Sequence, residues 1–183
     1  GPLAWLPRRP FLNEQDAAWR HRVVTVVVAC HLPALVLCAL LTGHSLPHSL
    51  AELVPVLTLL GASLGPFGRR ARQLCASLAL LTCSALLVHL FHGQTELHFH
   101  FFVAVALIAL YQDWTVFAAA IAFVAPEHAL VGLAAQHEVY DHGGDPPAWA
   151  ALHAGCVLAE SAVPIMFGKA GERAHAGVEA RDG

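Results

Sequence analysis

Long apolar runs separated by short polar stretches dominate the chain from residue 23 to residue 168. The runs lack the period-two alternation of a transmembrane barrel, so they predict helices. A helix rises 1.5 Å per residue, and about 20 apolar residues therefore cross the roughly 30 Å hydrocarbon layer of a bilayer. Six segments approach this length, at about residues 23–43, 49–66, 74–92, 97–112, 115–135 and 148–168.

The composition agrees with insertion into a membrane. Of the 183 residues, 57% are hydrophobic and 13% are charged, which leaves too few charges to cover a water-facing surface. We therefore predict an all-α integral membrane protein with a bundle of about six transmembrane helices at residues 23–168 and polar segments at 1–22 and 169–183. A net charge of −3 argues against nucleic acid as a partner and leaves membrane lipid as the expected surroundings.

The basic residues fall in three places, and alternate connections contain none. Because cytoplasmic loops carry the excess of Lys and Arg, this distribution places both termini and the loop between the second and third spans in the cytoplasm. The connection at residues 111–114 is then also cytoplasmic, and Asp113 is expected to cap the fifth span. The basic residues are Arg8, Arg9, Arg20, Arg22, Arg69, Arg70, Arg72, Lys169, Arg173 and Arg181.

Histidine is the unusual residue of this chain: its 13 copies exceed the 10 Lys and Arg together, and most lie toward the predicted outer face. Residues 89–100 read HLFHGQTELHFH, in which Gly93 is expected to break the chain between two helices. Imidazole and carboxylate groups that converge from several helices are suitable ligands for zinc, copper or non-haem iron. The candidate ligands are His89, Glu96, His98, His100, His128, His142 and His153.

Other histidines receive different interpretations. Those in the outer connections are expected to be solvated interfacial residues, namely His44, His48, His92 and His137. His31 and Glu160 fall near the membrane midplane, where we predict that they pair, because unpaired ionisable groups are costly there. A protonated Glu160 bonded to a backbone carbonyl is the alternative, and a hydrogen-bonded network without metal is the alternative for the candidate ligands.

Three stretches together resemble a known kind of sensor: SALLVHLFHGQTELHFHFFVAVALIALYQDW, PEHALVG and VYDHGGDPPAWAALHAG. They are similar to the multi-histidine transmembrane sensor region of bacterial methyl-accepting chemotaxis proteins, diguanylate cyclases and histidine kinases. The resemblance covers roughly residues 20–165. It carries over to His31, His89, Glu96, His98, His100, Asp113, His128, His142, Trp149 and His153. This chain has Glu127 and His128 where the family often has paired histidines.

The resemblance implies a sensory input module in the bacterial cytoplasmic (inner) membrane that signals to a cytoplasmic output domain or protein. The polar segment 169–183 is too short for a cyclase, kinase or methyl-accepting domain, so we expect the output part outside these 183 residues. By analogy alone, the resemblance also implies a homodimer. We expect one or more ions of copper, iron or zinc beneath the outer surface, where the metal could bind a small ligand such as a gas.

Two alternatives stay open. A metal-dependent membrane hydrolase or oxidase would use Glu96 or Asp141 as a general base toward a metal-bound water. A receptor is favoured over this enzyme because the sequence shows no Ser or Cys nucleophile with a base beside it. A haem protein would use two histidines as axial ligands, such as His31 with His89 or His153, but the carboxylates among the histidines favour a bare ion.

Overall fold

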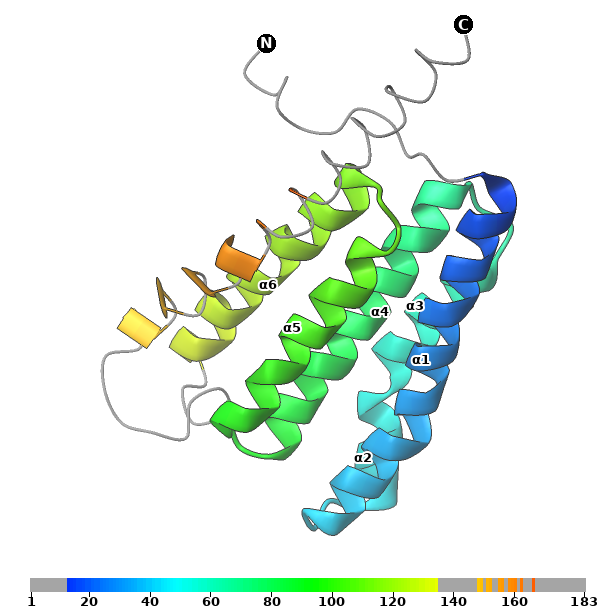
Figure 1. The fold of residues 1–183 in the computed structure, drawn as a ribbon. Coiled ribbons are helices and arrows are strands. Elements are labelled where there is room, and N and C mark those ends of the chain that lie inside the picture. The colour runs from blue at the N-terminus through cyan, green and yellow to red at the C-terminus, as the bar shows by residue number, and fades with distance from the viewer. Residues whose placement is uncertain are drawn as a thin grey trace, which may run out of the picture.

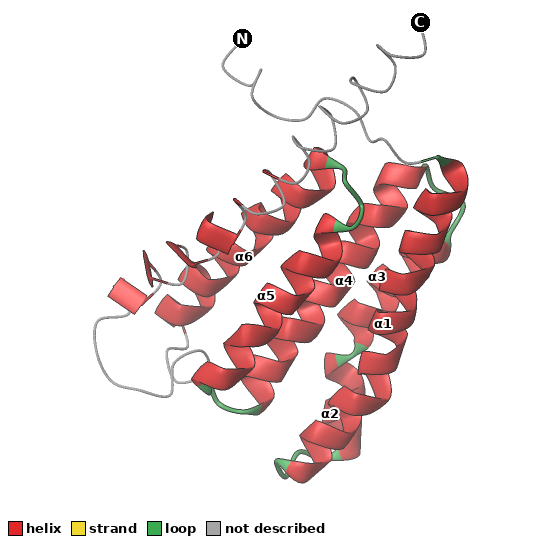
Figure 2. Cartoon of the chain, viewed as in Figure 1, coloured by secondary structure: helices red, strands yellow, loops and turns green. Residues whose placement is uncertain are grey.

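The computed structural model describes residues 13–134 and a set of helical residues between 148 and 166. Throughout this described part the regular secondary structure is helical (Figure 2). Figure 1 shows the helices running side by side in a bundle. They are α1 (Glu14–Leu41), α2 (Leu46–Glu52), α3 (Val54–Leu64), α4 (Arg69–Leu90), α5 (Thr95–Ala109) and α6 (Trp114–Ala134).

The first five predicted spans coincide with these helices, and the second is broken into α2 and α3 with a bend of 42°. Of the described helices, α1 and α4 are long and apolar enough to cross a membrane, and the bent pair becomes a third if it forms one span. Both α5 and the Trp114–Val124 part of α6 are shorter apolar helices. The length and composition of these helices support insertion into a membrane. Six spans with cytoplasmic termini remain a prediction, and much of segment 148–168 lies outside the described residues.

Polar side chains and left-handed residues mark the helix boundaries. The side chain of Asn13 accepts a hydrogen bond of 2.7 Å from the backbone N–H of Asp16 and so caps α1. Between α4 and α5 the chain reverses through His92 and Gly93, both with positive φ, as the position of Gly93 predicted. Asp113 Oδ1 accepts a bond of 2.9 Å from the Thr115 N–H, which confirms the predicted cap at the start of α6.

Helix α4 lies at the centre of the described bundle, against α1, α3, α5 and α6. Its apolar face is completely buried at Ala76, Leu80 and Leu81, which accounts for its central position. A row of buried polar residues runs along the same helix, formed by Gln73, Ser77 and Ser84. Helix α4 therefore presents hydroxyl groups as well as apolar side chains to its neighbours.

Three arginine contacts tie sequence-distant segments together at one end of the bundle. Arg69 pairs with Glu14 across 3.0 Å, and Arg70 pairs with Asp113 across 3.0 Å. The Arg20 Nη1 donates to the Leu110 carbonyl across 2.7 Å. The starts of α1, α4 and α6 thus meet at one end of the bundle. The predicted topology requires this, because it places Arg20, Arg69 and Arg70 on the same side of the membrane. The location of this end in the cytoplasm stays a prediction.

Candidate metal centre

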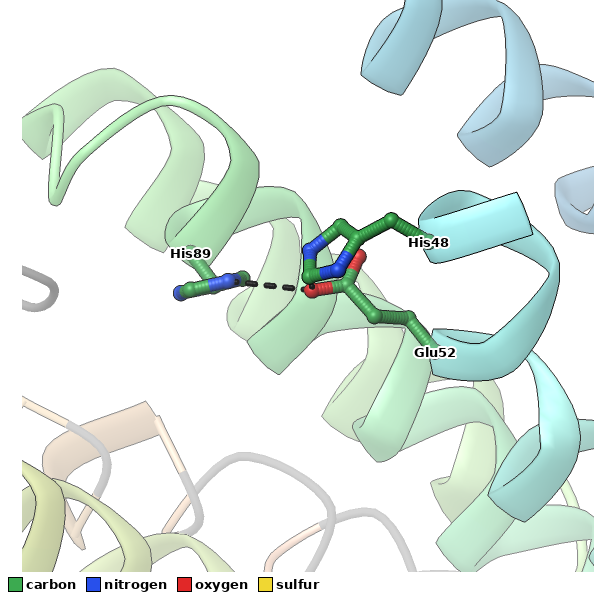
Figure 3. A group of neighbouring side chains, drawn as sticks. All are labelled: His48, Glu52 and His89. Carbon is green, nitrogen blue, oxygen red and sulfur yellow. Dashed lines mark ion pairs between the residues drawn. The ribbon is translucent and has the colours of Figure 1, made fainter. Parts of the chain in front are cut away.

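Two neighbouring elements bring three potential ligands together at the other end of α4. His48 and Glu52 are four residues apart on α2 and therefore share one face of that helix. His89 belongs to the last turn of α4. The Nε2 atoms of both histidines lie 3.1 Å from the same atom, Oε1 of Glu52 (Figure 3). We call these three residues the outer cluster.

The outer cluster has the donor set of a metal site. Its three ligand atoms all lie within 4.8 Å of one another. The Glu52 side chain is 18% exposed, whereas those of His48 and His89 are 53% and 39% exposed, so the carboxylate sits beneath two imidazoles that water can reach. Two imidazole nitrogens and one carboxylate oxygen suit zinc, copper or iron, and they leave a coordination position for water or another ligand.

A further histidine flanks this cluster. The ring of His44 stacks on that of His48 with a centroid distance of 5.4 Å and an interplanar angle of 13°. The hydroxyl of Thr42 has two carbonyl acceptors, on Cys38 and Ala39, each at 3.0 Å. It therefore accepts from His44 Nδ1, 2.9 Å away, and this bond holds the ring in place against the cluster.

A second pair of histidines lies deeper along the helices. His31 of α1 and His100 of α5 face each other with their Nε2 atoms 2.9 Å apart and their ring centroids 4.9 Å apart. His31 Nδ1 donates to the Val27 carbonyl across 2.7 Å, and His100 Nδ1 lies 2.8 Å from the hydroxyl of Ser84. We call His31 and His100 the histidine pair. In each ring the Nδ1 atom has an oxygen partner, and the Nε2 atom, which we call the inner nitrogen, points at the other histidine.

A third location of histidine is the arginine-rich end of the bundle, where His21 lies before the predicted span at 23–43. Its Nε2 donates to the Ser63 carbonyl across 3.0 Å, and its Nδ1 lies 3.0 Å from the Tyr111 hydroxyl. Burial lowers the pKa of His21, the bond to Ser63 opposes this shift, and the positive charge of Arg72 lowers the pKa further. His21 is therefore held as a neutral, hydrogen-bonded imidazole.

The structure distributes the sequence-predicted ligands over different places. His89 joins the outer cluster, and His100 joins His31. Buried His98 donates from Nδ1 to the Gln94 carbonyl across 3.1 Å, whereas Glu96 is exposed in the first turn of α5. The position of His128 falls on α6, but its side chain lies outside the described part, as do His142 and His153.

The predicted pair of His31 and Glu160 stays a prediction. In the described residues both ring nitrogens of His31 have the partners given above, Val27 and His100. Glu160 is partly buried in a helical position, and its Oε2 has no hydrogen-bond partner within the described part of the chain.

Sequence reasoning did not select Glu52, and it assigned His48 to the solvated residues. The available signal was the four-residue spacing of His48 and Glu52, which places them on one face of any helix that contains both. That signal was obscured because the predicted second span began at residue 49 and thereby separated His48 from Glu52. Only the short helix α2 and its position beside α4 bring the two residues to His89.

The fold and these clusters define a helical membrane protein with histidines gathered at three depths. Comparison with known proteins adds a signalling relative: the chain is similar to "Transducer protein Htr8" of Halobacterium salinarum, with 38% identity over 160 residues. The match covers 78% of this chain and 25% of the relative, so the chain spans about a quarter of that protein's length. No protein-family model matches the chain. No solved structure matches it.

Proposed function

We propose that the chain is a membrane-embedded sensory input module that binds a transition metal ion near the outer membrane face and signals to a cytoplasmic output domain or protein. The observation that carries the metal part is the outer cluster, in which two imidazoles and a carboxylate lie within coordination range of one point. The similarity to a protein named a transducer supports the signalling part.

The path of the signal follows from α4. This helix carries His89 in its last turn and Arg69 and Arg70 at its start, so one continuous helix links the outer cluster to the arginine contacts with Glu14 and Asp113. The other two ligands belong to α2, which is joined to α3 through a bend of 42°. An ion that draws α2 and α4 together would favour one packing of the helices over another.

The proposal keeps the wider ligand set from the sequence as part of the site. Glu96, His98, His100, His128, His142 and His153 are proposed as further ligands or as groups that orient ligands, in one or more metal sites. The chain is proposed to cross the cytoplasmic membrane several times, surrounded by lipid, and to act as a homodimer. Copper, iron and zinc are the ions to be compared.

The test is metal analysis of the purified full chain in lipid nanodiscs, by elemental mass spectrometry and absorption spectroscopy of one sample. We expect a stoichiometric transition metal that is lost in Glu52→Gln and His89→Asn. Retention of the metal by both variants would remove the outer cluster from the site, and a Soret band would replace the bare ion by haem.

The signalling part needs a separate readout. Hydrogen exchange of residues 14–22 and 110–114, at the arginine-rich end, is measured with and without the metal. We expect metal to change the protection of these amides in the wild type and not in Glu52→Gln. Metal binding without any change at this end would contradict transmission through α4.

A further inference from the structure

The histidine pair presents two inner nitrogens whose protonation is determined by their surroundings. The Val27 carbonyl can only accept, so His31 carries its proton on Nδ1 and offers a lone pair at Nε2. The 2.9 Å contact then needs one positive centre or one proton between the two Nε2 atoms. In the neutral pair, His100 supplies that proton from its own Nε2.

Ser84 permits a second arrangement of the same atoms. Its hydroxyl lies 2.8 Å from His100 Nδ1 and 3.3 Å from the Leu80 carbonyl. When the hydroxyl donates to Leu80, it accepts from His100 Nδ1, and the Nε2 of His100 then carries a lone pair as well. Both inner nitrogens now face each other as acceptors, each ring being oriented by an oxygen behind it. This is the arrangement by which neighbouring groups orient histidine ligands of metal ions.

The geometry points to a metal site in addition to the outer cluster: we propose that His31 and His100 bind one monovalent copper ion between their Nε2 atoms. The proton on His100 moves from Nε2 to Nδ1 when the ion enters, so the neutral pair gains the ion without a net loss of protons. The site rests on the proposed function in so far as His100 is one of its further ligands, but it shares no residue with the outer cluster, so different variants test the two sites.

The choice of a monovalent ion follows from charge and from ligand number. The contacts recorded for the pair within residues 13–134 are to each other, to one hydroxyl and to one carbonyl, with no carboxylate among them. The cost of placing an ion in a low-dielectric region grows with the square of its charge, so a divalent ion costs roughly four times as much as a monovalent one. Zinc also takes four ligands as a rule, whereas this pair supplies two.

Binding would have a mechanical consequence. Two metal–imidazole bonds of about 2.0 Å, arranged in line, place the nitrogens about 4 Å apart, which is about 1 Å more than in the metal-free pair. Because His31 is bonded to the carbonyl of its own helix, a displacement of its ring is transmitted to α1. The ion would therefore separate α1 from α5 at this depth.

The experiment uses the full chain in nanodiscs, with Glu52→Gln and His89→Asn combined as the background, so that only His48 of the outer cluster remains. Cu(I) is titrated anaerobically against a chromogenic Cu(I) chelator, and Zn²⁺ is titrated in parallel. We expect one equivalent of Cu(I) and at least a 100-fold weaker affinity for Zn²⁺. Equal affinity for both ions would overturn the monovalent assignment.

Variants then locate the bound ion. Addition of His100→Asn to this background should abolish binding of the one equivalent of Cu(I). Ser84→Ala should lower the Cu(I) affinity about 10- to 100-fold, because it removes the group that orients the His100 ring. The matched control is Ser77→Ala, which removes another buried hydroxyl of α4 that bonds within its own helix to the Gln73 carbonyl. Unchanged Cu(I) binding in His100→Asn would overturn the proposal.

A measurement on unaltered ligands covers the case in which His100→Asn does not fold. X-ray absorption of the Cu(I)-loaded protein in the same background should show two light-atom neighbours at about 2 Å, with the outer-atom scattering of two imidazole rings and without sulfur. A sulfur neighbour, or fewer than two imidazole rings, would overturn the pair as the site. Failure to bind Cu(I), with a proton between the two Nε2 atoms in nitrogen NMR, would identify a shared proton in place of the metal. Neither result changes zinc binding by the wild type, which reports on the outer cluster.

Discussion

The outer cluster and the histidine pair each join two imidazoles from different helices, but they differ in what surrounds the nitrogens. In the outer cluster both Nε2 atoms lie 3.1 Å from one carboxylate oxygen, and the imidazole of His48 is exposed whereas that of His89 is partly exposed. In the histidine pair the Nε2 atoms meet each other at 2.9 Å, with a hydroxyl and a carbonyl behind them. The same residue type therefore has two chemical environments in one chain.

The partner of each imidazole determines which charge the site can hold. A carboxylate supplies a full negative charge, which compensates a divalent ion or a protonated imidazole. A hydroxyl and a carbonyl supply only dipoles, and they orient a neutral ring without compensating a double charge. We therefore expect divalent ions at the outer cluster and at most a single positive charge at the histidine pair.

The largest expected effect is on zinc binding. Glu52→Gln keeps the size of the side chain and removes its charge, so Zn²⁺ affinity should fall at least about 100-fold in calorimetric titration. Asp16→Asn is the matched control, because Asp16 is an exposed carboxylate in the first turn of α1, at the arginine-rich end. An equal loss in Asp16→Asn would mean that the fall reflects lost surface charge and not a lost ligand of the outer cluster.

The next effect concerns stability at the histidine pair. Ser84→Ala removes the partner of His100 Nδ1 and should lower the free energy of unfolding by about 1–3 kcal/mol. Ser77→Ala should change it by no more than about 0.5 kcal/mol, since that hydroxyl only bonds back to its own helix. Thermal unfolding in detergent without metal compares the two. Equal losses would mean that the hydroxyl of Ser84 does not support the pair.

A pH experiment on His21 tests whether burial without a carboxylate keeps an imidazole neutral. Its pKa lies below the ordinary value of 6.5, so the unfolded state binds more protons than the folded state as the pH falls through 6.5. This group therefore destabilises the fold at acidic pH and has no effect well above 6.5. Between pH 7 and 5, His21→Gln should reduce the slope of unfolding free energy against pH by up to about 1.4 kcal/mol per unit.

The control for that experiment is His92→Gln, because His92 is an exposed histidine in the turn between α4 and α5. It should leave the slope as it is in the wild type. If His21→Gln steepens the slope, or if both variants have the same effect, the neutral state assigned to His21 is wrong.

The smallest expected effect is at His44. Its ring stacks on His48 and adds no ligand atom to the three of the outer cluster, so His44→Ala should weaken Zn²⁺ binding only about two- to fivefold through lost stacking. His44→Phe retains an aromatic ring and should restore most of that loss. A decrease as large as that of Glu52→Gln would make His44 a fourth ligand.

The apolar runs predicted the positions of α5 and α6 within a few residues and the C-terminal ends of α1 and α4, because apolar content is a local property; α1 begins at Glu14, nine residues before the predicted span, since its first turns are polar. Gly93 and Asp113 were also readable as a break and a cap, since each acts on its own backbone neighbourhood. The bend between α2 and α3 was not predicted. Pro47 is the second residue of α2 and Pro55 is the second residue of α3, so each proline lies in the first turn of a separate helix within what reads as one apolar run.

The site was predicted less completely than the helices. His89 and His100 were selected because they belong to a dense histidine segment, yet the structure places them in different clusters. Glu52 was missed because it is isolated in the sequence and acquires significance only beside His89. Contacts between residues 37 or 69 positions apart depend on how each helix is rotated and tilted, which no local pattern contains.

The helical character of this chain, its apolar segments and the grouping of its basic residues in three places can all be read from the sequence, because hydropathy and charge act through the solvent on each segment separately. The contacts of His48 and His89 with Glu52, and of His31 with His100, arise only when the helices pack. The physical reason is that a ligand set is a property of facing helices: α4 touches both α3 and α5, and its packing selects which histidines share a depth and a direction.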